Sequence, residues 1–172
     1  MIKLNRKQDC CGCTACASIC PKSCIRMKED KEGFLYPETD ISLCVNCNAC
    51  NNVCPVINKK DRRTPLQSFA AINKDSETIM KSSSGGVFSA LAEYVLDHSG
   101  VVFGAVWEND KVVHTHIEDI DELYRMRCSK YVQSDLKDSF RQARKFLVEG
   151  RQVLFSGTPC EIGGLRSFLR KE

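Results

Sequence analysis

Two cysteine-rich stretches contain the residues of this chain best suited to chemistry. Residues 10–21 read C-C-G-C-T-A-C-A-S-I-C-P, and residues 44–55 read C-V-N-C-N-A-C-N-N-V-C-P. Both contain the pattern C-x2-C-x2-C-x3-C-P, which takes in eight of the 12 cysteines. Thiolates at this spacing bind the irons of 4Fe–4S clusters. The sequence therefore predicts two 4Fe–4S sites.

The fourth cysteine of each stretch is predicted to serve the cluster of the other stretch. The first three cysteines step round a tight loop, in which Gly12 permits unusual backbone angles. The fourth follows one helical turn after the third, so its side chain is carried away from that loop, and the next proline ends the helix. The predicted ligand sets are therefore crossed: Cys10, Cys13, Cys16 and Cys54 at the first site, and Cys44, Cys47, Cys50 and Cys20 at the second.

Zinc is the alternative metal, because zinc sites also use paired C-x2-C units. Such sites usually combine two pairs that lie well apart, whereas here three cysteines at x2 spacing precede C-P. The spacing favours iron and sulfide. Cys11 and Cys24 fall outside the pattern, and Cys11 is interpreted as a bystander thiol beside a ligand.

The segment between the two stretches predicts a β-hairpin. Residues 24–28 and 33–36 alternate in polarity around a polar turn. Four apolar or aromatic side chains are expected to cover the clusters: Ile25, Met27, Phe34 and Tyr36. Such a cover matters because solvent access helps to set the reduction potential of a cluster.

Composition and charge exclude several classes of protein. The 172 residues are 42% hydrophobic, which supports a buried core, and the formal charge of +3 becomes about −1 if each cluster with its thiolates adds about −2. No basic surface interleaved with aromatic residues indicates nucleic-acid binding. The longest apolar run, residues 101–107, is too short to span a bilayer. The N-terminus turns polar at once, and the cysteine spacing suits metals better than disulfides, so a cytoplasmic protein is expected.

A charged stretch at residues 58–64 predicts a solvated linker between two domains, residues 1–63 and residues 64–172. The second domain alternates strands with helices, which predicts an α/β layer with a mixed sheet. Strands are expected at 68–72, 101–107, 112–117 and 153–156, an extended stretch at 130–134, and helices at 87–96, 119–126, 136–149 and from 158 onward.

Two turns in the second domain are candidates for chemistry. Residues 82–86 place hydroxyls and two glycines at a helix start, where backbone N–H groups favour a phosphate; an ordinary N-cap explains them equally well. Residues 158–161 predict a capping box with Pro159 at the first helical position. Cys160 is a candidate for a thiol of lowered pKa in a ligand crevice, and the alternative is a capped helix without chemistry.

Other residues of these types favour structural roles. His114 and His116 alternate on one predicted strand and share a face, which is more typical of a polar sheet face than of a metal site. Trp107 is expected to be a packing residue. Cys128 has no partner in the sequence and is expected to be a core thiol.

Two resemblances cover nearly the whole chain. Residues 8–56 resemble the bacterial two-cluster ferredoxins, motif for motif and in length. S-S-S-G-G-V-F-S-A-L (82–91), C-S-K-Y-V-Q-S (128–134) and F-S-G-T-P-C-E-I-G-G-L (155–165) are similar, in this order, to the coenzyme F-420 hydrogenase/dehydrogenase beta-subunit family. The expected fold is thus an α+β ferredoxin-like two-cluster module followed by an α/β domain.

The second resemblance implies a flavin. Members of that family couple an iron–sulfur module to FAD and pass electrons to a deazaflavin or another organic acceptor. The implied flavin contacts are Ser83, Ser84, Gly85, Gly86, Lys130, Tyr131, Ser134, Thr158 and Cys160. Family members continue beyond the T-P-C segment, so the α/β domain is expected to be incomplete at its C-terminus.

Two functions follow from these patterns. The first is an oxidoreductase module in which two 4Fe–4S clusters exchange electrons with a flavin, working with a redox partner protein or subunit. The second is a plain ferredoxin-type carrier or docking subunit, whose second domain binds no flavin. The sequence leaves open whether the chain is itself an enzyme.

Overall fold

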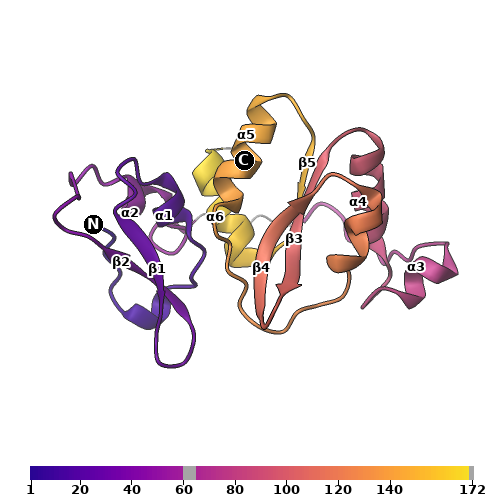
Figure 1. The fold of residues 1–172 in the computed structure, drawn as a ribbon, viewed down its shortest axis with the longest axis horizontal. Coiled ribbons are helices and arrows are strands. Elements are labelled where there is room, and N and C mark those ends of the chain that lie inside the picture. Colours follow the sequence, from indigo (N-terminus) through magenta and orange to yellow (C-terminus); the bar gives the residue numbers. More distant parts are fainter. Residues whose placement is uncertain (60–64, 171–172) are drawn as a thin grey trace. The chain divides into compact units, whose positions relative to one another are not determined.

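The computed structural model describes residues 1–59 and 65–170, and these fall into two compact units (Figure 1). The first, here called the cysteine unit, comprises residues 1–59, 136–141 and 157–170. The second, the sheet unit, comprises residues 65–135 and 142–156. The predicted boundary at residues 63 and 64 lies outside the described residues.

The cysteine unit begins with a short 3₁₀ helix, Lys7–Asp9, and the helix α1, Ala15–Ile19. The strands β1, Ile25–Glu29, and β2, Leu35–Thr39, then form an antiparallel hairpin. Asp30 shapes its turn, because its carboxylate accepts the N–H groups of Glu32 (3.0 Å) and Phe34 (3.1 Å). The predicted hairpin is confirmed. The helix α2, Ala49–Val53, follows, and the C-terminal helix α6, Pro159–Leu169, belongs to the same unit.

The two cysteine runs have the same backbone course. Thr14 and Asn48 precede α1 and α2, and both are left-handed, with φ of 57° and 63°. Each helix is five residues long and ends at the fourth cysteine of its run, Cys20 or Cys54, in an extended conformation. The repeated spacing in the sequence is thus a repeated local structure.

The sheet unit contains a mixed three-stranded sheet in the order β4-β3-β5 (Figure 1). β3, Val101–Glu108, pairs antiparallel with β4, Lys111–Ile117, and parallel with β5, Val153–Phe155. The remaining elements are the helices α3, Ser76–Met80, α4, Val87–Asp97, and α5, Ser139–Val148, and a 3₁₀ helix, Ile120–Arg125. The first three residues of α5 lie in the cysteine unit. The predicted mixed sheet is confirmed.

Alternation along the strands gives this sheet two apolar faces. On one face, Val102 and Val106 of β3 pack with Ala92 and Leu96 of α4. On the other face, Phe103 stacks on Phe155, with ring centroids 5.3 Å apart. Phe146 of α5 meets Phe103 edge-on at 6.2 Å. The sheet is therefore held between a helix and an aromatic layer.

The predicted strand at residues 68–72 is wrong. These residues are irregular, and Phe69 and Ile72 are 82% and 69% exposed. β3 already has a neighbour on each side, so the sheet offers this segment no place at its centre. The N–H of Asn73 instead donates to the carbonyl of Gly85 at 2.7 Å, which ties the segment to the turn before α4.

Two smaller expectations also need correction. Trp107 is not a packing residue, because it lies near the β3–β4 turn, opposite Val112, and is 56% exposed. Cys128 is exposed rather than a core thiol, since it sits in an irregular segment with a φ of 67°. The stretch at residues 130–134, expected to be extended, is neither helix nor strand, and a single bridge joins the next residue, Asp135, to Val113.

Phe103 and Trp107 lie on the same strand and offer a matched test of the aromatic layer. Phe103→Ala is expected to lower the free energy of unfolding by about 3–5 kcal/mol, because it opens a cavity under Phe155 and Phe146. Trp107→Ala is expected to cost less than about 1 kcal/mol, because its side chain is largely in water. Urea denaturation followed by circular dichroism measures both, and equal losses would contradict the assignment.

Candidate metal centre

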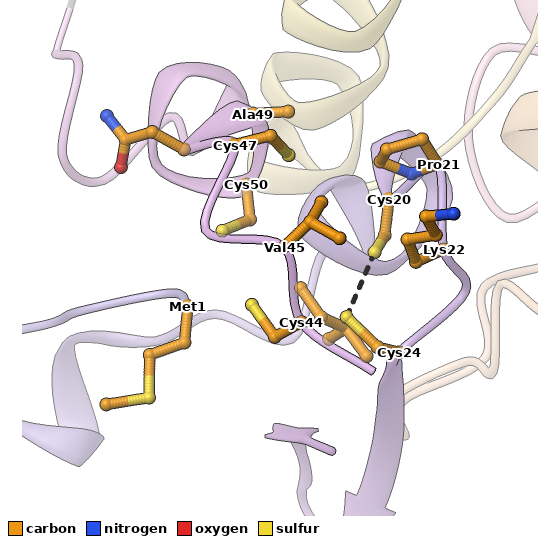
Figure 2. Close-up of a pocket in the computed structure, with 12 residues that line it drawn as sticks. Met1, Cys20, Pro21, Lys22, Cys24, Cys44, Val45, Cys47, Ala49 and Cys50 are labelled. Carbon is orange, nitrogen blue, oxygen red and sulfur yellow. Dashed lines mark hydrogen bonds between the residues drawn. The ribbon is translucent and has the colours of Figure 1, made fainter. Parts of the chain in front are cut away.

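Two hollows in the cysteine unit bring the predicted ligands together. The first has a volume of about 340 Å³ and is lined by four of them, Cys10, Cys13, Cys16 and Cys54. The second, of about 330 Å³, is lined by the other four, Cys20, Cys44, Cys47 and Cys50 (Figure 2). Each hollow thus takes three cysteines from one run and the fourth from the other. Binding of iron by these crossed sets stays a prediction.

The local backbone explains this exchange. Gly12, with φ of 66°, turns the first loop between its first two cysteines. The helix α1 then separates Cys16 from Cys20, and Cys20 leaves the helix in an extended conformation. The same steps recur from Cys50 to Cys54 across α2. The fourth sulfur of each run therefore departs from its own loop.

Only some of the hairpin residues that were expected to cover the clusters line a hollow. Ile25 lines the second hollow, and Met27 and Pro37 line the first. Phe34, in contrast, is 49% exposed at the hairpin turn. Tyr36 lies beneath the Lys7 ammonium group, 4.1 Å from its ring centroid. Two of the four predicted covering residues thus line a hollow.

A fifth thiol borders the second hollow. Cys24 is buried, and its sulfur lies 3.3 Å from that of Cys20 (Figure 2). The hydrogen bond with Cys20 raises the pKa of Cys24 to about 11. In the first hollow, burial raises the pKa of Cys16 to about 12. Iron binding requires thiolates, so filling these hollows releases protons.

The chemistry of the donor set fits an iron–sulfur cluster. Each hollow offers five thiols within an apolar lining, four of them from the predicted ligand set, and thiolates are the ligands of 4Fe–4S clusters. Within residues 1–59 and 65–170, no three Cys, His, Asp or Glu side chains form a group that could hold a single metal ion.

C-terminal residues complete the cysteine unit, which the sequence reasoning missed. The Arg141 guanidinium donates to the carbonyls of Ser18 (2.8 Å) and Ala17 (3.1 Å) at the end of α1. Gly164 of α6 packs so closely that a Cβ there would lie 3.0 Å from the sulfur of Cys13. The adjacent glycines in a predicted helix were the available signal, because close packing against a neighbouring element is one use of a helical glycine.

The T-P-C turn is confirmed as a helix start but not as an acidic thiol. The Glu161 carboxylate accepts the N–H of Thr158 at 2.6 Å, as in a capping box, and Pro159 opens α6. The Cys160 sulfur lies 3.1 Å from the Thr158 hydroxyl. Burial raises the pKa of Cys160, so the expectation of a lowered value is wrong. The side chain of Cys160 also contacts that of Cys11.

The structure brings the S-S-G-G turn and the C-S-K-Y segment together within the sheet unit. Ser83 accepts the N–H of Ser129 at 2.8 Å, and Cys128 donates to the carbonyl of Lys81 at 3.6 Å. The glycines serve packing, because a Cβ on Gly85 would clash with the carbonyl oxygen of Ala71. Ser84 lies in the same turn, and Gly86 is left-handed and caps α4.

Other implied flavin contacts have partners within the fold. The Lys130 ammonium group donates to the carbonyls of Arg125 (3.0 Å) and Arg127 (2.8 Å), and burial lowers its pKa. Tyr131 is 92% exposed. Ser134 is buried and bonded to His114. Thr158 and Cys160 belong to the cysteine unit, whereas the other seven lie in the sheet unit.

His114 acts as an internal brace rather than as a metal ligand. Its Nε2 lies 2.9 Å from the carbonyl oxygen of Ser156, which can only accept, so Nε2 carries the proton. In the neutral ring Nδ1 then accepts from the hydroxyl of Ser134 at 2.8 Å. The ring also stacks on Phe155 at 5.4 Å. His116 faces the same aromatic layer, 5.3 Å from Phe103 between ring centroids.

Comparison with protein families yields two matches. Residues 9–58 match the model of the 4Fe-4S dicluster domain, and residues 68–140 match that of the coenzyme F420 hydrogenase/dehydrogenase, beta subunit N-term. No curated protein matches the chain. The two matches occur in the predicted order and confirm the two-part resemblance. An iron–sulfur domain followed by this beta-subunit domain supports an iron–sulfur electron-transfer role. Among the described residues, no helix is long and apolar enough to cross a membrane.

Neighbouring glycines of α6 provide a matched test of the first hollow. Gly164→Ala is expected to reduce the iron bound per chain, because the new Cβ would press on the Cys13 sulfur at 3.0 Å. Gly163→Ala is expected to retain the iron and to stabilise the helix by up to about 1 kcal/mol, because its Cβ would lie 3.6 Å from Pro55. Iron and sulfide analysis after anaerobic reconstitution compares the two. Equal iron contents would show that α6 does not support the first hollow.

Proposed function

We propose that this chain is an electron-transfer module with two 4Fe–4S clusters, which exchange electrons with a flavin or another organic acceptor. The observation that carries the proposal is the pair of hollows, each bordered by four cysteines of the crossed pattern. The match to a dicluster domain over residues 9–58 supports the same number of clusters.

Each cluster, when bound, accepts and releases one electron at a time. The protein holds and shields these groups. Cys10, Cys13, Cys16 and Cys54 would hold the first cluster, and Cys44, Cys47, Cys50 and Cys20 the second. Ile25, Met27 and Pro37 give the hollows part of their apolar lining, and the polarity around a cluster helps to set its reduction potential. Cluster thiolates persist in reducing surroundings, so we place the protein in the cytoplasm.

The proposal of an organic electron acceptor rests on the match to the beta-subunit domain. Residues 68–140 match a beta-subunit domain, which supports a redox partner subunit. A flavin converts between one-electron and two-electron chemistry, so it would join the clusters to a deazaflavin or another organic acceptor. The turn at Ser83 and the segment at Lys130 and Tyr131 are the proposed contacts within the sheet unit, because Ser83 and Ser129 hold them side by side.

A second function is favoured because several of the implied flavin contacts already bond to or pack against other residues of the fold. Lys130 caps backbone carbonyls, Ser134 is bonded to His114, and Gly85 packs against Ala71. Each of these residues thus has a structural task without a ligand. The alternative function is therefore a ferredoxin-type carrier or docking subunit whose sheet unit binds no flavin.

The crossed ligand sets predict which cluster is lost when a given cysteine is replaced. Because the Cys24 sulfur lies 3.3 Å from Cys20, the clean test removes both thiols. Cys20→Ala/Cys24→Ala is expected to lower the iron content from about eight to about four per chain, as loss of one 4Fe–4S cluster requires. The control Cys24→Ala keeps about eight, because Cys24 stands outside the predicted set.

Electron paramagnetic resonance of the reduced double variant then identifies the remaining cluster. We expect that replacing Cys10, Cys13 or Cys16 in the double variant abolishes the remaining signal. Survival of the signal in that triple variant would refute the crossed arrangement.

Flavin binding separates the two proposed functions. The module function predicts that protein reconstituted anaerobically with clusters and FAD retains flavin through gel filtration, with resolved flavin bands after cluster removal. Tyr131→Ala is expected to weaken retention, because Tyr131 is an implied contact that is 92% exposed, whereas Tyr124→Ala serves as a control on another exposed tyrosine. Complete loss of flavin on the column would favour the carrier.

A further inference from the structure

Thr14 combines three unusual features at the edge of the first hollow. It is left-handed, with φ of 57°, which is rare for a β-branched residue. It is 3% exposed and lines the first hollow beside Cys13. Among the residues that the structure describes, its hydroxyl oxygen is one of two buried side-chain atoms without a hydrogen-bond partner. Strained and unsatisfied groups cluster at functional sites.

The usual task of a threonine at this position does not account for the hydroxyl. Thr14 precedes α1, where a threonine side chain commonly accepts a backbone N–H of the first turn. Here the side chain makes no such capping bond. The hydroxyl carries a donor that is removed from water, and it belongs to a residue that lines a hollow bordered by thiols.

The second run provides an internal comparison. Asn48 occupies the equivalent place before α2, with nearly the same backbone angles. Asn48 also lines the second hollow, yet it is exposed, and its side chain is bonded to those of Asn51 and Asn52. At this equivalent position the first hollow therefore has an unsatisfied hydroxyl, and the second has a satisfied amide.

We propose that the Thr14 hydroxyl donates a hydrogen bond to a sulfur of the cluster in the first hollow and raises the reduction potential of that cluster above that of the other. This inference rests on the proposed function, because it requires a cluster in that hollow. A hydrogen bond to sulfur stabilises the reduced form, which carries one more negative charge, over the oxidised form. A single electron on the chain then occupies the first cluster in preference to the second. Thr14 acts on the potential through this hydrogen bond and is not itself a ligand.

A redox titration of the reconstituted chain, followed by electron paramagnetic resonance, tests the proposal through substitutions that keep or remove the hydroxyl. Thr14→Val retains the branched shape without a donor. It is expected to lower one of the two one-electron potentials by about 59 mV, which corresponds to a tenfold change in the reduction equilibrium. Thr14→Ser keeps the donor and is expected to titrate like the unsubstituted chain. An equal shift in both variants would overturn the proposal, because shape and not the hydroxyl would be responsible.

A glycine at each of the equivalent positions gives the matched control and guards against misfolding of the valine variant. Glycine tolerates the left-handed conformation, so both variants are expected to fold. Thr14→Gly is expected to lower the same potential as Thr14→Val, and Asn48→Gly to leave both potentials in place. Unmoved potentials in Thr14→Gly, or an equal shift in Asn48→Gly, would overturn the proposal.

Iron analysis of the same samples separates failure of this inference from failure of the proposed function. About eight irons per chain with unchanged potentials would contradict the role of Thr14 alone. An unsubstituted chain that binds no 4Fe–4S cluster would contradict the proposed function and, with it, the hydrogen bond.

Discussion

The cysteine unit depends on one constraint, the single helical turn between the third and fourth cysteine of each run. Because α1 and α2 are each only five residues long, the fourth sulfur is carried off its own loop without being carried far. Cys20 and Cys54 then border the opposite hollows. Neither run supplies all four predicted ligands of one hollow, so the proposed ligation requires the two runs to fold together, and the β1–β2 hairpin that links them supplies part of the lining.

Near-repetition makes the differences between the two hollows informative. The backbone repeats, but the first hollow has Cys11 and Thr14 in its lining, whereas the second has Cys24 and Asn48. The first is also backed by Gly164 of α6, since that glycine leaves just enough room for the Cys13 side chain. Two sites of equal ligation in unequal surroundings are expected to have unequal potentials. A module that hands electrons to a partner gains direction from such a difference.

The sequence predicted best where spacing constrains the backbone directly. Cysteines separated by two or three residues, a proline after the fourth, and alternation on each side of the polar turn between residues 28 and 33 imply local geometry whatever surrounds them. The predictions from the sequence failed where contacts between segments far apart in the chain determine the structure. Residues 68–72 have the composition of a strand, but β4 and β5 take both places beside β3. Trp107 is apolar, yet it lies near the end of β3 and is largely exposed. The burial of Thr14 and the packing of Gly164 against Cys13 depend on tertiary structure that no local pattern encodes.

Native mass spectrometry of the anaerobically reconstituted chain is the most direct test of whether the two runs hold two 4Fe–4S clusters. We expect a folded species whose mass exceeds that of the bare chain by two 4Fe–4S units, with a one-cluster species as a minor intermediate. A saturated mass with a single cluster, or with zinc in place of iron and sulfide, would contradict it.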